Sequence, residues 1–277
     1  MTRRFTRLAW AAAACTYLLI VLGAVVRVTG SGLGCGEHWP RCHGRWFPPF
    51  DDIGTLIEWN HRLFAGLVTI LVVAVAGAAW WMSRRTDNRQ PTTDAPPAPL
   101  AYVALGLLIT QVLLGAVVVK LALPPWTVIL HLGTAMLLLA TLLVTARGHP
   151  RTPPTRAELA ALTLGFGTVL LGALTANLGA ASACLGFPLC NGALFPSGNY
   201  LQYVHWVHRL FAYTLFAYVV WWAVRSKRRG VWYVVALVTV QVAVAATMVV
   251  LALPQPLQAA HVAVGAAVWT ALVLAVF

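Results

Sequence analysis

Four histidines interrupt long apolar stretches of this chain, at His61, His131, His208 and His261. The imidazole nitrogen is a good ligand for iron, and two histidines on facing helices can hold a flat porphyrin between them. A hydrogen bond to a neighbouring helix explains any single one of them equally well. Four histidines at equivalent positions of an internal repeat favour haem over four separate hydrogen bonds. Zinc and copper are disfavoured, because each half offers only two strong ligands.

The composition indicates the scaffold that must position these residues. Of 277 residues, 60% are apolar and only 9% are charged, against about 25% charged in a soluble domain. The net charge of +12 does not indicate a nucleic-acid partner, because the basic residues form short clusters between apolar runs. So few charges cannot cover a water-facing surface, and we therefore expect most of the outer surface to contact a lipid bilayer.

Eight stretches reach the roughly 20 mostly apolar residues that cross a bilayer. A helix satisfies its own backbone polar groups inside the membrane, and the short alternating segments of a β-barrel do not occur. We therefore expect an all-α integral membrane fold with eight transmembrane helices. The expected spans are residues 8–28, 58–82, 100–121, 126–146, 158–178, 204–224, 231–252 and 256–277.

The basic residues of the loops predict the orientation. Thirteen of the nineteen Lys and Arg residues fall on one side of the eight expected spans, which makes that side cytoplasmic. Both termini then lie in the cytoplasm, and the short segment before the first span favours a bacterial plasma membrane. Each histidine lies three to six residues inside an even-numbered span. This places the histidines roughly 5–10 Å from the outer ends of their helices, near the outer leaflet.

Two short motifs occur twice in the chain. HRLFA spans His61–Ala65 and His208–Ala212, and LALP spans Leu121–Pro124 and Leu251–Pro254. Each LALP motif is preceded by a glutamine and followed by a histidine, at identical distances in the two halves. Ordered matches of this kind indicate an internal repeat of four helices, with both copies crossing the membrane in the same direction.

The repeat predicts the domain organisation. We expect two pseudo-symmetric four-helix bundles, an N-terminal half at 1–82 plus 100–146 and a C-terminal half at 147–277. Residues 83–99 are polar and rich in proline, and we expect them to form a cytoplasmic linker. Within this division the histidines pair as His61 with His131, and as His208 with His261.

The two halves differ beside their HRLFA motifs. Glu58 lies three residues before His61, on the same helical face, and His205 occupies the matching position before His208. A carboxylate there could simply favour the positive end of a helix dipole. Alternatively, it could give or take a proton beside a reacting haem. If only one half reacts, we expect it to be the half that contains Glu58.

Arginines and cysteines near the outer helix ends leave several interpretations open. Arg62 and Arg209 directly follow their histidines, and each could reach the membrane interface or pair with haem propionates. The expected outer loops carry two cysteine pairs, and local disulfides are plausible there because that side is oxidising. A thiol-redox role for the first pair, or a metal site with His38 and His43, stays an alternative. The pairs are Cys35 with Cys42 and Cys184 with Cys190.

Taken together, these motifs resemble the haem A synthase family of the bacterial type. The resemblance rests on EWNHRLFAG at 58–66, HWVHRLFA at 205–212, one histidine on each of the fourth and eighth spans, and the paired loop cysteines. It covers essentially the whole chain. It implies an oxidoreductase that converts the C8 methyl group of haem O to a formyl group by successive O₂-dependent hydroxylations, giving haem A for terminal oxidases.

The resemblance also implies roles for individual residues. His208 and His261 would hold a haem B cofactor, His61 and His131 would take the substrate haem O, and Glu58 would be needed for activity. The implied partners are O₂, an electron donor and, as a candidate, haem O synthase. Two rival interpretations remain: a di-haem membrane cytochrome b that transfers electrons, and a haem-handling protein without chemistry.

Overall fold

The computed structural model describes residues 3–49, 51–86, 98–148 and 153–277. Within these ranges the chain is all-α, and each of its eight long helices is long and apolar enough to cross a membrane. Two short 3₁₀ helices, η1 (Ser31–Leu33) and η2 (Ala180–Ala183), lie in the loops that follow α1 and α5. The eight helices are α1 (Arg3–Val28), α2 (Ile53–Thr86), α3 (Ala98–Lys120), α4 (Pro125–Arg147), α5 (Arg156–Asn177), α6 (Tyr200–Ser226), α7 (Arg229–Val250) and α8 (Gln255–Val276).

The predicted fold class is confirmed. The helix starts differ most at α1, which begins five residues before the expected position 8, and at α2 and α6. Helices α2 and α6 begin five and four residues before the expected positions 58 and 204. In each case a polar side chain caps a turn that precedes the apolar run. The Thr55 backbone N–H donates to Asp52 at 2.6 Å, and Asn199 accepts from the backbone N–H groups of Leu201 and Gln202. The donation from Thr55 also holds the pKa of the Asp52 carboxyl below its usual range.

The expected linker at 83–99 is helical at both of its edges. Helix α2 continues to Thr86, and α3 already begins at Ala98. The central part of this segment, 87–97, lies outside the described residues.

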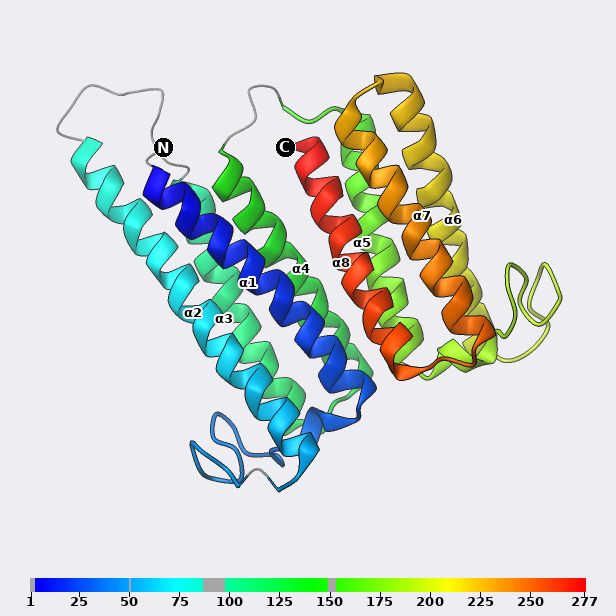
Figure 1. Ribbon diagram of the computed structural model, residues 1–277, viewed down its shortest axis with the longest axis horizontal. Helices are drawn as coiled ribbons and strands as arrows, with labels where there is room; N and C mark the ends of the chain where they lie inside the picture. Colours follow the sequence, from blue (N-terminus) through cyan, green and yellow to red (C-terminus); the bar gives the residue numbers. More distant parts are fainter. Residues whose placement is uncertain (1–2, 50, 87–97, 149–152) are drawn as a thin grey trace. The chain divides into compact units, whose positions relative to one another are not determined.

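The chain divides into two compact units. The first comprises 1–122, 134–153 and 277, and the second comprises 123–133 and 154–276. In the first unit α2 packs against both α1 and α3. In Figure 1 the loop between α1 and α2, residues 29–52, lies at one end of this unit. We call it the first loop.

The helices α5 to α8 of the second unit form a closed ring. Helix α5 contacts α6 and α8, and α7 contacts the same two helices, so that α6 and α8 occupy opposite corners. At one end of the ring is the loop between α5 and α6, residues 178–199, which we call the second loop (Figure 1). At the other end, Arg228 donates to Glu158 and to the backbone oxygen of Ala275, both at 2.6 Å.

Small residues are frequent where the helices pack, and many large apolar residues face outward. Ala9, Ala12 and Ala104 are completely buried, whereas Ile70 is 68% exposed and Leu113 is 60% exposed. This distribution is typical of a membrane protein, because small side chains let helix backbones approach closely while lipid solvates the large apolar ones.

The LALP repeat has the same conformation in both places. Ala122 and Leu123 have positive φ angles of 56° and 63°, and Ala252 and Leu253 have 60° and 64°. The left-handed residues end α3 and α7, and a proline follows each pair at once, before the next helix. The turn reverses the chain within a few residues, so it holds the glutamine of one helix and the histidine of the next at nearby depths.

Candidate functional site

His61 and His208 are held in the same way, each against a glycine of the preceding long helix. A Cβ atom on Gly23 of α1 would lie 3.3 Å from Cε1 of His61, and a Cβ atom on Gly172 of α5 would lie 2.9 Å from Cε1 of His208. Each imidazole therefore lies against bare backbone. The matching Leu-Gly-Ala segments in the two halves of the sequence account for this recurrence.

The histidines lie deeper in their helices than expected. His61 and His208 are eight residues after the first residues of α2 and α6, which corresponds to about 12 Å along the helix axis. His131 and His261 are six residues inside α4 and α8, or about 9 Å. The difference from the expected 5–10 Å arises from the capped first turns of α2 and α6.

In the second unit, His208 and His261 come from the opposite corners of the ring. His208 Nδ1 is buried and has no hydrogen-bond partner among the described residues. Across the ring, the side-chain nitrogen of Gln241 on α7 lies 3.2 Å from Nδ1 and 3.3 Å from Nε2 of His261. Two imidazoles on diagonal helices at similar depth can serve as axial ligands of one flat macrocycle.

His131 occupies the first turns of α4. These turns, within 123–133, group with the second unit, whereas His61 belongs to the first unit. Two residues after His131, a Cβ atom on Gly133 would lie 3.0 Å from the side chain of Leu170 on α5. The pairing of His61 with His131 stays a prediction.

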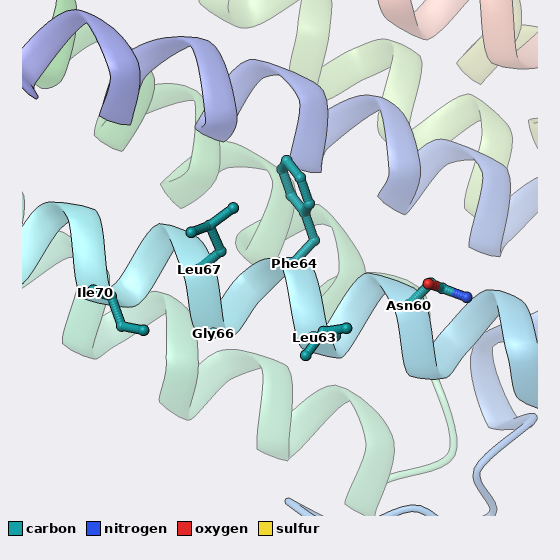
Figure 2. A pocket seen from close by; sticks show the side chains of 6 residues that line it. All are labelled: Asn60, Leu63, Phe64, Gly66, Leu67 and Ile70. Carbon is teal, nitrogen blue, oxygen red and sulfur yellow. The ribbon is translucent and has the colours of Figure 1, made fainter. Parts of the chain in front are cut away.

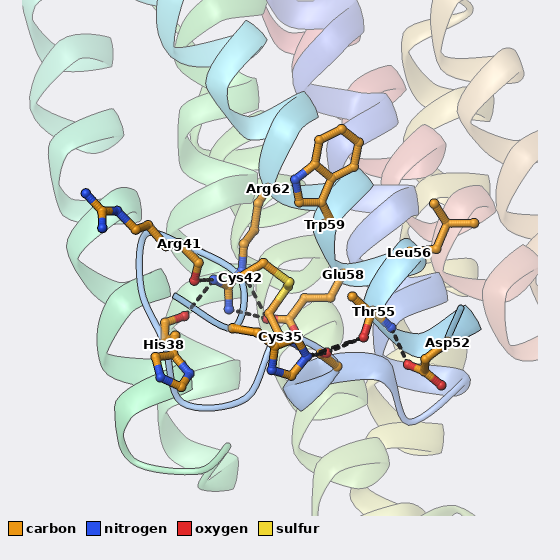
Figure 3. The surroundings of a disulfide bond; sticks show 12 residues. Cys35, His38, Arg41, Cys42, Asp52, Thr55, Leu56, Glu58, Trp59 and Arg62 are labelled. Carbon is orange, nitrogen blue, oxygen red and sulfur yellow. Dashed lines mark hydrogen bonds and ion pairs between the residues drawn. A yellow bond between two sulfur atoms is a disulfide. The ribbon is translucent and has the colours of Figure 1, made fainter. Parts of the chain in front are cut away.

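Glu58 is buried beneath the first loop, with both of its oxygens occupied (Figure 3). Its Oε2 accepts the backbone N–H of Cys35 at 2.7 Å, and its Oε1 accepts Nε and Nη2 of Arg62 at 3.1 and 2.5 Å. The carboxylate is 3% exposed. Such fixed donors stabilise its charge and hold it one helical turn from His61 on the same face of α2.

Close backbone contact brings the first loop to Glu58. A Cβ atom on Gly34 would lie 2.3 Å from the backbone oxygen of Gly54, so only glycine fits where the loop meets the start of α2. The hydroxyl of Thr55 donates to the Gly34 oxygen at 2.6 Å. The loop therefore lies close enough for the Cys35 amide to reach Glu58.

Arg62 and Arg209 anchor the two loops. Nη1 of Arg62 donates to the backbone oxygens of His38 and Arg41, at 2.7 and 3.0 Å (Figure 3). Arg209 donates to the oxygens of Leu189 and Cys184, at 2.9 and 2.6 Å. In the structure, therefore, these arginines bind backbone carbonyls of the loops. Contact with the membrane interface and pairing with haem propionates stay predictions.

The position of Glu58 has a neutral counterpart in the second unit. His205 lies 3.1 Å from the backbone oxygen of Ala180 through Nδ1 and accepts Nε of Arg209 at 3.2 Å through Nε2. Arg209 is 7% exposed, and no carboxylate forms an ion pair with it among the described residues. The second unit therefore keeps the arrangement of an arginine beneath a loop but lacks the acid.

The disulfides Cys35–Cys42 and Cys184–Cys190 are both formed. Tryptophans that directly follow Glu58 and His205 hold the loops from the other side. Trp59 donates to the oxygen of Trp46 at 2.8 Å, and Trp206 donates to that of Leu194 at 2.9 Å. The sequence interpretation missed this function, although the repeated tryptophan of EWNHRLFA and HWVHRLFA was a visible signal.

The alternative of a metal site in the first loop gains no support. His43 Nε2 lies 2.8 Å from the backbone oxygen of Gly34, and its ring centroid is 6.4 Å from that of His38. Within the described ranges, no three His, Cys, Asp or Glu side chains are arranged to hold a metal ion.

A groove runs along α2 of the first unit (Figure 2). Gly66 lies within it, and the matching residue in the second unit is Tyr213, whose hydroxyl donates to the backbone oxygen of Pro188 at 3.0 Å. None of the residues that line the groove is an iron ligand or an acid. They are Asn60, Leu63, Phe64, Gly66, Leu67 and Ile70.

The arrangement predicts unequal effects of removing the two arginines. We expect Arg62→Met to lower the free energy of opening of the first loop by about 3 kcal/mol, because it leaves the buried Glu58 carboxylate without its ion partner. Arg209→Met removes hydrogen bonds without leaving a buried charge unpaired. It should lower the free energy of opening of the second loop by about 1–2 kcal/mol. Hydrogen exchange of the loop amides in detergent measures both values. Equal effects would contradict the importance of the ion pair.

Comparison with known proteins agrees with this geometry. The model of the COX15-CtaA family, described as cytochrome oxidase assembly protein, matches residues 6–273. A protein of Alkalihalophilus pseudofirmus named "Heme A synthase" is 34% identical over 207 residues, which cover 70% of this chain and 67% of the relative. A protein of the same name from Bacillus pumilus is 32% identical, over 73% of this chain and 69% of the relative. The chain therefore belongs to the COX15-CtaA family of cytochrome oxidase assembly proteins.

Proposed function

We propose that this protein is a haem A synthase, which oxidises the C8 methyl group of haem O to a formyl group and so provides haem A for terminal oxidases. One observation carries the proposal. Both units hold a histidine against a glycine beneath a disulfide-closed loop, but only the first unit places a buried carboxylate beside it. Relatives named "Heme A synthase" support the same activity. A duplicated site with one acid is what we expect of a protein with one reacting haem and one permanent haem.

The second unit fits a resident haem B. His208 has no side-chain partner for its buried Nδ1, Gly172 leaves room for its ring, and His261 lies at the opposite corner of the ring of helices. We infer that His208 and His261 would hold the haem iron. Bound there, haem B supplies one-electron transfer. The chain keeps water from these ligands by placing them about 9–12 Å inside the helices.

The N-terminal half of the sequence is assigned to the substrate. His61, together with His131, would bind the iron of haem O and fix the macrocycle relative to Glu58. The disulfide-closed first loop covers the outer end of α2 and keeps Glu58 3% exposed. Exclusion of water strengthens the electrostatic influence of the carboxylate on the reacting group.

Glu58 is assigned to proton transfer. Each hydroxylation consumes one O₂, two electrons from an external donor and two protons, and releases one water. After the second hydroxylation, the doubly hydroxylated carbon loses water to become the formyl group. Arg62 occupies Oε1 of Glu58, and Cys35 donates a single hydrogen bond to Oε2. Oε2 is therefore the atom with a lone pair left to receive and pass on a proton.

The proposal includes location and partners. The eight spans make the protein a multi-pass membrane protein, and we place both termini in the cytoplasm of a bacterium because the basic residues cluster on that side. The haem sites then lie toward the outer leaflet of the plasma membrane. Haem O synthase is a candidate partner, because it would deliver a substrate that is poorly soluble in water.

A di-haem cytochrome b is the second candidate, supported by the equivalent histidines of the two units. It offers no reason for a buried carboxylate in one unit and His205 at the same position in the other. A haem-handling protein without chemistry leaves the same difference unexplained.

The deciding experiment is expression of the full chain together with a haem O synthase, in a host that makes no haem A. Pigments are then extracted from the purified protein and separated by chromatography. Haem A should appear beside haem B. Two equivalents of haem B and no haem A would instead identify an electron-transfer cytochrome, and unchanged haem O would identify a haem-handling protein.

A further inference from the structure

Gln241 is a partly buried polar residue beside the assigned haem B site, and the reaction itself does not use it. Its side-chain nitrogen lies within 3.3 Å of both ring nitrogens of His261, and its Oε1 is buried with no hydrogen-bond partner among the described residues. Gly265, one turn after His261, leaves room for the amide, because a Cβ atom there would lie 3.3 Å from the Gln241 nitrogen. A buried acceptor without a donor is costly unless it serves a further purpose.

Iron binding by His261 would give the Gln241 oxygen a hydrogen-bond donor. A histidine that binds a metal through one ring nitrogen carries a proton on the other, and that N–H is normally donated to an oxygen acceptor. An amide nitrogen cannot accept this bond, whereas an amide oxygen can. Rotation of the Gln241 amide by about 180° exchanges its two ends and brings Oε1 to the imidazole edge. The same rotation provides the buried oxygen with a donor.

We propose that Gln241 is a positioning residue for the haem B cofactor: its amide oxygen accepts the Nδ1–H of His261 and leaves Nε2 of that ring for iron. The proposal rests on the assignment of His208 and His261 as axial ligands. The hydrogen bond fixes the tautomer and the rotation of the ring before haem binds, and it increases the electron density on the ligating nitrogen.

The two axial histidines are then unequal. His208 is held by backbone alone, at Gly172 and Thr168. His261 has an adjustable amide. The strength of the His261 hydrogen bond is therefore the means by which this chain sets the midpoint potential of the cofactor, since hydrogen bonding to an axial ligand is one of the factors that determine haem potentials.

Two substitutions at Gln241 of the full-length holoprotein test the proposal. Gln241→Met keeps the length of the side chain but removes the acceptor, and should increase the rate of haem B transfer to a haem-scavenging apoprotein by about 10- to 100-fold. It should also raise the midpoint potential. Gln241→Glu keeps an acceptor at the same place, should retain haem B, and should lower the potential. Gln111→Met, in the matching position of the first half, is the control and should leave haem B unchanged.

The outcomes distinguish a failure of this proposal from a failure of the assignment of His208 and His261 to haem B. If Gln241→Met and Gln241→Glu both show the potential and transfer rate of the unaltered protein, the positioning role is wrong although haem B is bound as assigned. If His208→Ala retains haem B, the cofactor assignment itself fails. Where Gln241→Met does not accumulate, an unchanged potential in Gln241→Glu alone overturns the proposal, and a lowered one supports it.

Discussion

Replacing Glu58 is expected to reduce haem A formation by about 10²- to 10⁴-fold, which is the usual contribution of a positioned acid or base. Haem B content should stay constant, and haem O should accumulate on the protein. The reason is local: Glu58 is 3% exposed and lies one turn from His61. Chromatography of pigments from cells that also express haem O synthase measures the ratio of haem A to haem O.

The substitution must distinguish proton transfer from support of the first loop. Glu58→Gln is preferred to Glu58→Ala, because its amide oxygen still accepts the Cys35 N–H while the proton-transfer group is lost. Glu158→Gln is the matched control, since Glu158 is also a buried acid in an ion pair but lies at the far end of α5. Wild-type haem A in Glu58→Gln, or equal losses in Glu158→Gln, would contradict the assigned role.

Arg62→Met adds a second comparison for the same residue. It disturbs the first loop but leaves the carboxylate in place. If Glu58 serves only to hold the loop, the two variants should lose haem A to the same extent. We expect Glu58→Gln to lose far more.

Replacing His208 with alanine is expected to remove haem B, with a decrease of about tenfold or more in haem per protein, since loss of an outer hydrogen bond to a ligand alone costs 10- to 100-fold in affinity. The substitution removes an axial ligand and leaves an empty space against Gly172. Absorbance of the purified protein and pigment extraction measure the loss. Without the electron-transfer haem, haem A formation should fall as well.

His205→Ala is the matched control for this substitution. His205 lies on the same helix, three residues earlier, and is 6% exposed, but it bonds to the second loop and to Arg209. It should keep haem B. Equal loss in both variants would mean that the bundle had been disrupted, and retention of haem B in His208→Ala would place the cofactor elsewhere. His61→Ala should lose haem A and keep haem B.

The sequence by itself determined the eight helices and their all-α class, and it made the two disulfides plausible while leaving a thiol-redox role open. Apolar stretches of sufficient length must form helices in a membrane, because no water is present to satisfy an open backbone. The repeated LALP motif correctly indicated a repeated turn, which recurs with the same left-handed residues. The expected starts were wrong by four or five residues at α1, α2 and α6. At α2 and α6 the reason is capping by Asp52 and Asn199, a local hydrogen-bond effect that hydropathy does not record.

Only the tertiary structure decided what surrounds three of the four histidines. The contact of Gly23 with His61, of Gly172 with His208 and of Gln241 with His261 depends on how neighbouring helices cross, which residue spacing does not specify. The contact of Glu58 with the Cys35 amide joins residues 23 positions apart across a closely packed loop. Spacing identified the chemical groups, and the folding of one loop and the packing of helix pairs determined which atoms of those groups are held and which are left for reaction.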